Sequence, residues 1–281
     1  MRTSVHGQIY YAHYDYDKKR TMAALKEAGF DCMAIGVMTN RPEWGPEHFE
    51  ASALEVRKFS EEIGLPINIA HAAGSDREAK ERSLKIAALC GAKYWVVHPR
   101  IPKPYQVDYR KLKEENFPRA IEDIASYAEL AKEYGIGIAV ENMFKYDWDW
   151  EYVRDASCSD PDEFIRYVDT LNDLYPGVFS ACLDTGHVAL VDQKPEDVIR
   201  KLGPRLSCLH VHDNDLTSDM HTIPGLFKID HVKLSEALHE IGYQGDFTLE
   251  ICCNYPKELV PAHMKYSAQV SRYYADLFEN K

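Results

Sequence analysis

The chain has 281 residues, of which 45% are hydrophobic and 28% are charged, as is ordinary for a soluble globular protein. Its formal net charge of −12 argues against broad affinity for nucleic acid. No apolar run approaches the ~18 residues of a membrane span, and the start, MRTSVHGQIYY, has no apolar signal segment. Seven cysteines without a framework spacing predict reduced thiols, and we therefore expect a cytoplasmic protein.

Strand-like apolar runs alternate with helical patterns along the whole chain. The expected strands cover residues 3–9, 30–36, 66–71, 94–98, 136–141, 178–184, 206–212 and 246–251. The expected helices cover residues 16–28, 47–63, 75–90, 113–134, 160–173, 195–202, 231–241 and 258–279. This alternation predicts a parallel sheet covered by helices. At this chain length, the pattern favours an α/β fold with one (β/α)₈ TIM barrel, a single domain over residues 1–281.

An open, doubly wound sheet would give the same alternation of strands and helices. Such a sheet usually carries a phosphate-binding glycine loop, or a ligand crevice at one reversal of strand order. The sequence contains neither a GxGxxG motif nor a GKS or GKT motif. Ligand-type residues instead follow strands three to eight, which suits a closed ring whose loops surround one central site.

Four expected strands end in a residue that can bind a metal ion: Glu141, Asp184, His210 and Glu250. Alternate residues of a strand face the same side. In these strands the ligand shares its side with small neighbours such as Ala139, while the opposite side is apolar. The four side chains should therefore point into the barrel. Their oxygen and nitrogen atoms suit Mn²⁺, Zn²⁺, Co²⁺ or Mg²⁺ and disfavour copper(I). A lone acid at a strand end is usually paired or capping, but four in alignment favour a shared metal.

Further polar residues near the same strand ends are candidates for a second metal or for substrate binding: His187, Asp219, His221, His71 and His98. For His71 and His98, substrate contact or a structural role is favoured over ligation. His212 shares the inward parity of His210 and is a candidate for substrate binding.

Two loop residues are weaker candidates for substrate binding. Arg100 could contact a phosphate or carboxylate, and Trp148 could stack on a sugar or simply pack in its loop. His6 lies near the end of the first strand, but nothing in its spacing requires it at the site.

The segments VENM, CLDTGH, HVHDND and LEIC resemble those of the xylose isomerase-like barrel superfamily. That superfamily includes sugar isomerases, ketose epimerases and endonuclease IV-type enzymes, and the resemblance covers essentially the whole chain. It implies that Glu141, Asp184, His210 and Glu250 bind one catalytic divalent metal. The endonuclease IV branch adds two further zinc ions, for which the five flanking candidates are matches. Sugar isomerase-like members often keep similar residues, so the ligand set leaves the branch open.

The four-ligand site suits proton transfer at a carbon next to a carbonyl, through a metal-stabilised enediolate. Glu141 and Glu250 are the expected catalytic residues. We therefore predict a metal-dependent sugar isomerase or epimerase that acts on a small sugar or polyol-derived substrate. The prediction admits either a monomer or a homo-oligomer. The alternative is an endonuclease IV-like multi-zinc phosphodiesterase acting at abasic DNA. A barrel that binds sugar without turnover is a third interpretation.

The loops favour the sugar enzyme over the nuclease. A nuclease must neutralise phosphates, whereas the loop FKYDWDWEYVRD is rich in acidic residues. At two positions the sequence departs from the families that it resembles, and these departures limit how closely the substrate can be predicted. Leu216 stands where ketose 3-epimerases carry an arginine that holds the substrate. Phe227 replaces the final glycine of the superfamily segment HxxPGxG.

Overall fold

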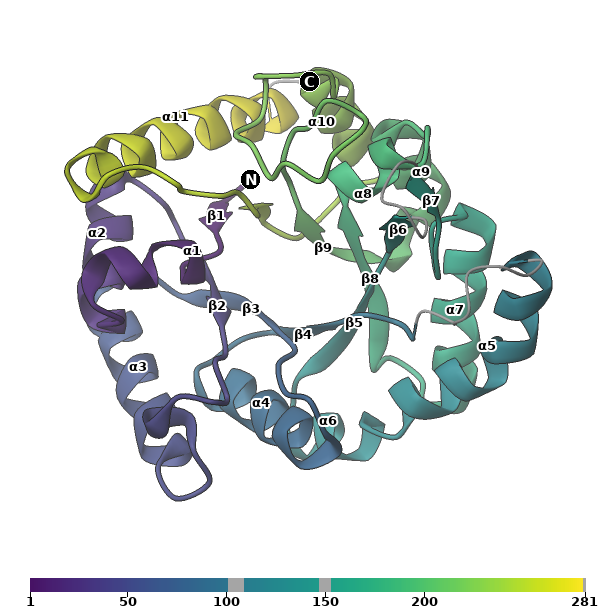
Figure 1. Cartoon of the computed structure of the whole chain (residues 1–281), viewed down its shortest axis with the longest axis horizontal. Coiled ribbons are helices and arrows are strands. Elements are labelled where there is room, and N and C mark those ends of the chain that lie inside the picture. The colour runs from purple at the N-terminus through teal and green to yellow at the C-terminus, as the bar shows by residue number, and fades with distance from the viewer. Residues whose placement is uncertain (101–108, 147–152, 280–281) are drawn as a thin grey trace.

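The computed structural model describes residues 1–100, 109–146 and 153–279. Within them, parallel strands form a central ring and helices surround it (Figure 1). The strands of the ring are β1 (Thr3–Val5), β2 (Met33–Gly36), β3 (Ile67–His71), β4 (Tyr94–Val97), β5 (Gly137–Glu141), β8 (Phe179–Asp184), β9 (Leu206–His210) and β10 (Phe247–Leu249). The main outer helices are α2 (Lys18–Ala28), α3 (Phe49–Ile63), α4 (Arg77–Leu89), α5 (Tyr109–Ala125), α6 (Ala128–Tyr134), α7 (Pro161–Leu174), α9 (Pro195–Leu202), α10 (His231–Glu240) and α11 (Val260–Glu279).

Hydrogen bonds join the ring strands in chain order. A six-stranded sheet runs β2-β3-β4-β5-β8-β9, and β1 pairs with β10, all in parallel. Isolated parallel bridges between His6 and Ala34 and between Val211 and Leu249 connect these two sheets at both edges. The ring is therefore closed, and the predicted TIM barrel is confirmed.

Most boundaries differ from those expected by a few residues, and two elements differ more. The first strand ends at Val5, because the backbone soon turns into a helix, where the Tyr10 N–H bonds the Gly7 carbonyl at 3.1 Å. The chain then forms α1 (Gln8–Tyr11) and the 3₁₀ turn η1 (Ala12–Tyr14). The helix expected over 113–134 is split into α5 and α6. Between them the Ser126 hydroxyl donates to the Asp123 carbonyl at 2.6 Å, a bond that competes with the helical pattern.

Several short elements lie outside the simple alternation. Two of them, β6 (Phe144–Tyr146) and β7 (Val153–Asp155), form an antiparallel hairpin after β5. The short helix α8 (Thr185–Leu190) follows directly on β8. The remaining 3₁₀ turns are η2 (Pro42–Trp44), η3 (Gly203–Arg205) and η4 (Lys257–Leu259). No helix among the described residues has both the length and the apolar character needed to cross a membrane.

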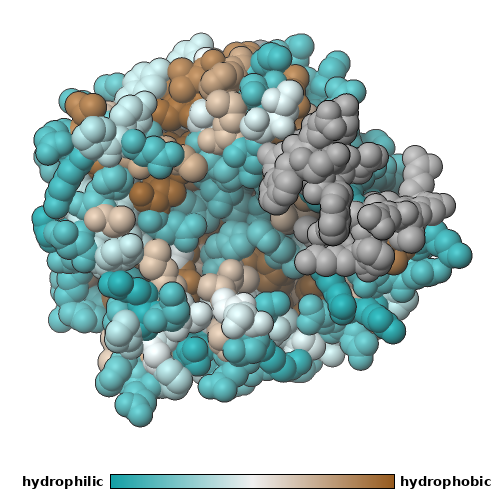
Figure 2. Space-filling model, viewed as in Figure 1, coloured by the Kyte–Doolittle hydropathy of each residue, from teal (hydrophilic) through white to brown (hydrophobic). Residues whose placement is uncertain are grey.

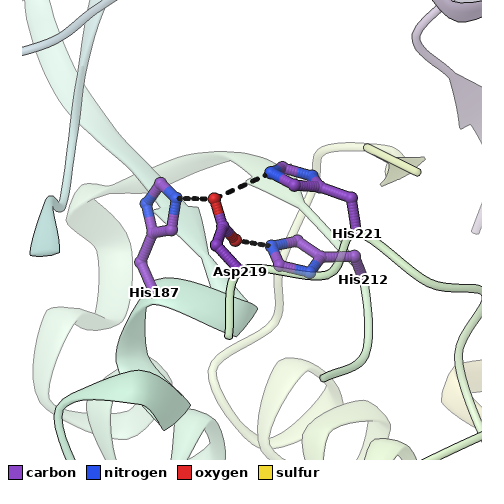
Figure 3. A group of neighbouring side chains, drawn as sticks. All are labelled: His187, His212, Asp219 and His221. Atoms are coloured by element: carbon purple, nitrogen blue, oxygen red, sulfur yellow. Dashed lines mark hydrogen bonds and ion pairs between the residues drawn. The ribbon is translucent and has the colours of Figure 1, made fainter. Parts of the chain in front are cut away.

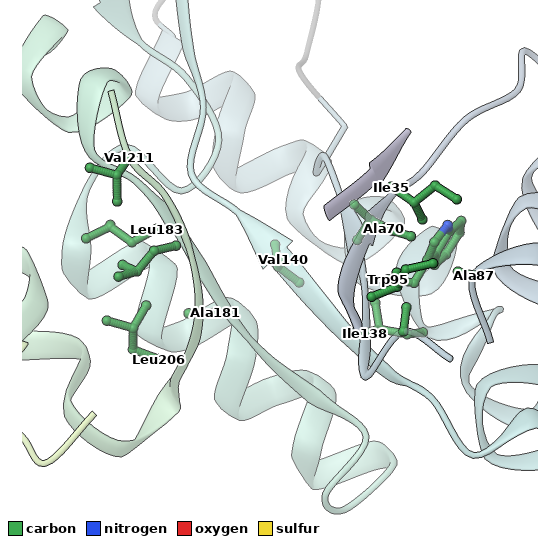
Figure 4. Packing of buried hydrophobic residues seen from close by; sticks show 14 of the residues in the cluster. Ile35, Ala70, Ala87, Trp95, Ile138, Val140, Ala181, Leu183, Leu206 and Val211 are labelled. Carbon is green, nitrogen blue, oxygen red and sulfur yellow. The ribbon is translucent and has the colours of Figure 1, made fainter. Parts of the chain in front are cut away.

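The two faces of the barrel strands bury different kinds of side chain. The outer face packs large apolar residues against the helices. Figure 4 shows Trp95 and Ile138 beside Ala87 of α4, and Leu183 near Leu206. The inner face contributes a separate, mostly small apolar cluster: Ala34, Ile69, Val96, Ala139, Cys182 and Cys208. The residues two positions further along several of these strands are the candidate ligands. The period-two argument therefore places them inside the barrel, at the carboxyl ends of the strands.

Candidate active site

The four predicted metal ligands converge at the carboxyl ends of the strands. Asp184 and His210 are direct neighbours in the β8–β9 register. His210 Nδ1 lies 3.1 Å from Glu141 Oε1 and 3.2 Å from Glu250 Oε2. The ligand atoms of all four residues lie within 4.8 Å of one another. We call Glu141, Asp184, His210 and Glu250 the central cluster.

The central cluster is buried and strongly charged. Glu141, Asp184 and His210 are at most 1% exposed, and the Glu250 side chain is 15% exposed. Burial opposes ionisation, but the charge of His210 outweighs it and holds the pKa of both Glu141 and Glu250 well below the usual range. Burial is likewise outweighed at His210, whose pKa the two glutamates raise well above its usual value. Both glutamates are therefore ionised at neutral pH.

A first flanking group joins the central cluster through Glu141. His71, at the end of β3, and His98, just after β4, approach each other with 3.0 Å between their Nε2 atoms. The other carboxylate oxygen of Glu141, Oε2, lies 3.3 Å from His71 Nε2 and 3.1 Å from His98 Nε2. Two imidazole nitrogens and one carboxylate oxygen thus meet at one point, as the ligands of a metal ion do.

A second flanking group lies on the other side, around Asp219 (Figure 3). Asp219 Oδ2 is 3.1 Å from His221 Nε2 and 3.8 Å from His187 Nε2, and Asp219 Oδ1 is 3.6 Å from His212 Nε2. His212 Nε2 also lies 3.0 Å from Asp184 Oδ1, which links this group to the central cluster.

The electrostatics of the second flanking group favour charged imidazoles. Burial opposes protonation of the His187 and His221 rings. At His187 the carboxylates of Asp184 and Asp219 outweigh burial and raise the pKa to about 10. At His221 the hydrogen bond to Asp219 does so and raises the pKa to about 9. These imidazoles pair with acidic neighbours that a cation or a substrate hydroxyl would also contact.

Two residues that the sequence did not single out, Asn142 and Gly186, hold this arrangement together. The Asn142 side chain accepts a bond from the Asp184 N–H at 2.7 Å and donates to the Asp184 carbonyl at 3.0 Å. A side chain at Gly186 would overlap the His212 ring, since an added Cβ would lie 1.9 Å from it. These contacts join residues far apart in the sequence, so no local pattern could have revealed them.

Asp213 organises the loop that carries Asp219 and His221. Its buried carboxylate accepts five backbone N–H bonds of 2.8–3.1 Å, from residues 214, 225, 227, 228 and 229. Phe227, the departure from the superfamily segment, donates one of these bonds through its backbone. A bond of that kind does not depend on the side chain, so the loop closes around Asp213 despite the substitution.

His6 is the other residue that the sequence reasoning did not place. It follows β1, is 0% exposed, and its ring stands edge-on to His210 with centroids 4.7 Å apart. The period-two rule applied to Ser4 and His6 was the available signal, but a strand expected to continue to residue 9 gave His6 no special position.

The two remaining predicted residues do not strengthen the site. Arg100 is exposed, and its carbonyl oxygen accepts a bond from the Ser157 hydroxyl at 2.8 Å. Its role in substrate binding stays a prediction. Trp148 lies outside the described residues.

The region around the clusters is open enough to admit a small molecule. Figure 2 shows a hydrophilic hollow near the centre of the view, over the barrel. A cavity of about 230 Å³ also opens beside His71 and His98, with Trp95, Tyr127 and Lys80 in its wall. Trp95 and Tyr127 belong to the outer core, so this cavity lies beside the two flanking histidines and not over the central cluster.

The central cluster fits a divalent cation. Two of its buried atoms, Asp184 Oδ2 and His210 Nε2, have no hydrogen-bond partner among the described residues. Among the described residues, the carboxylates of the central cluster form ion pairs with histidines and none with lysine or arginine. Three carboxylates so close together require a compensating positive charge. Hard oxygen donors with imidazole nitrogen are the donors that Mn²⁺, Co²⁺ and Zn²⁺ accept.

A closed parallel barrel with a polar site at the carboxyl ends of its strands defines the TIM-barrel class of proteins. The profile of the family described as "Xylose isomerase-like TIM barrel" matches residues 22–270. The chain therefore belongs to that family, as the motifs indicated.

Individual proteins show the same relationship. The chain is 24% identical to a D-psicose 3-epimerase of Enterocloster bolteae, over 86% of this chain and 80% of that protein. It is 22% identical to a D-psicose 3-epimerase of Ruminiclostridium cellulolyticum, over 87% and 83% of the two chains. Its fold matches a crystal structure of D-psicose 3-epimerase in the presence of D-fructose with a TM-score of 0.75. That match covers 99% of each chain at 18% identity.

Proposed function

We propose that this protein is a divalent metal-dependent sugar epimerase or isomerase. The observation that carries the proposal is the meeting of two ionised glutamates at one imidazole, inside a cluster that fits a metal ion. Similarity to two D-psicose 3-epimerases along most of the chain supports the same class of substrate, a small ketose.

In this proposal the bound ion is held by Glu141, Asp184, His210 and Glu250. When bound, the ion polarises a carbonyl and its neighbouring hydroxyl and stabilises the negative charge that develops there. The remaining step is proton transfer, which the protein's own side chains carry out.

Glu250 and Glu141 are the proposed acid and base. Glu250 is the more exposed of the two, and in our proposal its carboxylate removes the proton from the carbon next to the carbonyl. Glu141 then takes a proton from His71, whose Nε2 lies 3.3 Å from Glu141 Oε2 and whose pKa the Glu141 carboxylate raises against the effect of burial. Glu141 delivers this proton to the opposite face of the carbon, which inverts its configuration, and exchange with solvent returns the proton from Glu250 to His71. Delivery to the neighbouring carbon would give isomerisation instead.

The flanking residues are proposed to bind and orient the substrate. His187 Nε2, which lies 3.8 Å from Asp219, can donate to a sugar hydroxyl, and Asp219 can accept from one. A fixed sugar position shortens the path of the proton between the two glutamates.

The proposal is tested by elemental analysis followed by a substrate screen. Roughly one Mn, Co or Mg per chain is expected in protein purified without added metal. The protein should then exchange a carbon-bound proton of a free ketose with deuterium from solvent, as NMR detects. A metal-loaded protein that catalyses no such exchange with ketoses or their phosphates would contradict the proposal.

A multi-zinc phosphodiesterase acting at abasic DNA is the second candidate. One observation favours it: the structure brings both flanking groups next to the central cluster, so that nine candidate ligands lie together. Two to three Zn per chain and cleavage of abasic DNA would make this candidate the leader. The net charge of −12 disfavours it, because a duplex carries dense negative charge.

A further inference from the structure

His6 occupies a position that none of the assigned roles explains. It directly follows β1, and its backbone N–H bonds the Leu249 carbonyl at 2.9 Å, which fixes it beside β10. The bridge between His6 and Ala34 fixes it on the other side, beside β2. The residue is 0% exposed, so the barrel holds the imidazole rigidly in its interior.

The imidazole faces the central cluster without a hydrogen bond. Neither ring nitrogen has a hydrogen-bond partner among the described residues. His6 Nε2 is 3.8 Å from Glu250 Oε1, which is too long for a hydrogen bond. Its ring is edge-on to His210, and ligand atoms of His6, His210 and Glu250 lie within 4.8 Å of one another.

A buried polar group with no hydrogen-bond partner costs about 1–3 kcal/mol, and an ion that it binds is one of the few explanations for such a group in a folded protein. A neutral imidazole always carries one nitrogen with a free lone pair. A lone pair beside the Glu250 carboxylate is repelled by it unless a positive charge lies between the two groups. A cation satisfies the imidazole and the carboxylates together, whereas a sugar hydroxyl would have to reach a ring that is 0% exposed.

We propose that His6 is a further ligand of the divalent ion at the central cluster, added from the end of β1. This inference rests on the metal dependence of the proposed function. The shell would then contain two imidazoles, from His6 and His210, and three carboxylates. Imidazole suits Mn²⁺, Co²⁺ and Zn²⁺ better than Mg²⁺, so His6 would bias the site against Mg²⁺.

The test compares metal binding by wild-type protein with that of His6→Phe and His6→Asn, in the absence of sugar. His263→Phe is the matched control, since His263 is also buried but bonds Tyr10 outside the clusters. Each protein is stripped with a chelator, and Mn²⁺ is titrated in by calorimetry. Pulsed EPR of Mn²⁺ at less than one equivalent then counts the coordinated nitrogens. Circular dichroism of the stripped proteins reports folding, and His6→Asn replaces His6→Phe if the larger side chain prevents it.

Loss of His6 is expected to weaken Mn²⁺ binding by about 10–100-fold and to remove one nitrogen coupling, while His263→Phe changes neither. Weaker binding with an unchanged number of nitrogen couplings would overturn the inference, because His6 would then only support the ligands. Unchanged affinity would overturn it as well. In both cases the wild-type protein still binds Mn²⁺, so the proposed function survives. A wild-type chain that binds neither Mn²⁺ nor Co²⁺ would overturn the proposed function and this inference together.

Discussion

At the amino end of the barrel strands, Asn68 is 4% exposed, and both polar atoms of its amide have partners. It accepts from the Ser4 hydroxyl at 3.2 Å and donates to the Thr248 hydroxyl and to Asp246 at 3.1 Å. At the carboxyl end, His6, Asp184 and His210 are also buried. Each of them keeps a polar atom that has no hydrogen-bond partner among the described residues.

In this barrel, the amino end of the strands contributes to stability, and the carboxyl end contributes to function. A satisfied buried network holds the fold together, whereas unsatisfied buried groups cost stability and persist where they serve a ligand. The same division is general for TIM barrels, whose active sites lie at the carboxyl ends of the strands. Substitutions at the two ends should therefore fail in different ways.

The largest effect is expected at the carboxyl end, for Glu250→Gln. The amide cannot accept a proton from carbon, so kcat should fall by about 10²–10⁴-fold, with a smaller effect on sugar binding. Deuterium exchange at the substrate carbon measures the first quantity and calorimetry the second. The exposed Glu258→Gln is the control. Full activity in Glu250→Gln would remove this residue from the proposed mechanism.

Asn68→Ala tests the amino end. The substitution leaves the buried partners of the amide unsatisfied, and the free energy of unfolding should fall by about 3 kcal/mol. Activity per folded molecule should not change. Urea unfolding measures the loss, and Gln244→Ala, an exposed amide at the same end, should be neutral. A drop in kcat for folded Asn68→Ala would show that the two ends are not independent.

Metal removal sharpens the comparison further. An ion that binds only the folded chain stabilises it by about 2.7 kcal/mol at a concentration 100 times its Kd. Mn²⁺ should therefore raise the Tm of the wild-type protein, and a chelator should reverse the increase. Asp184→Asn should lose this increment, while Asn68→Ala should keep all of it. An equal response in both variants would argue against the central cluster as the binding site.

The smallest effect is expected for Asp31→Asn. Burial opposes ionisation of Asp31, but hydrogen bonds from the Thr3 backbone and from Arg272 outweigh it and lower its pKa. This carboxylate stabilises the fold at neutral pH, and the contribution is lost as pH falls below about 4 and through the lowered pKa. The side chain is 35% exposed, so solvent screening limits the contribution to about 1 kcal/mol.

Thermal unfolding at pH 7 and at pH 3 checks this last prediction. The difference in Tm between the two pH values should be smaller in Asp31→Asn than in the wild-type protein. An equal difference would mean that the carboxyl has the same pKa in the folded and unfolded chain.

The sequence alone determined the barrel and the positions of the central cluster. Strand and helix periodicities are local properties of the chain, and the parity of residues such as Glu141 and His210 follows from them. Their place at the ends of consecutive strands then implied one shared site.

Only the tertiary structure decided how the surrounding residues complete that site. His6 meets Glu250 because closure of the ring brings the two ends of the chain together. Gly186 makes room for His212, and Asp213 folds its loop through bonds to backbone groups up to 16 residues away. Such contacts depend on the curvature of the closed barrel and on where each strand stops. Neither is encoded in the period of any single segment, so these partners become visible only in the folded chain.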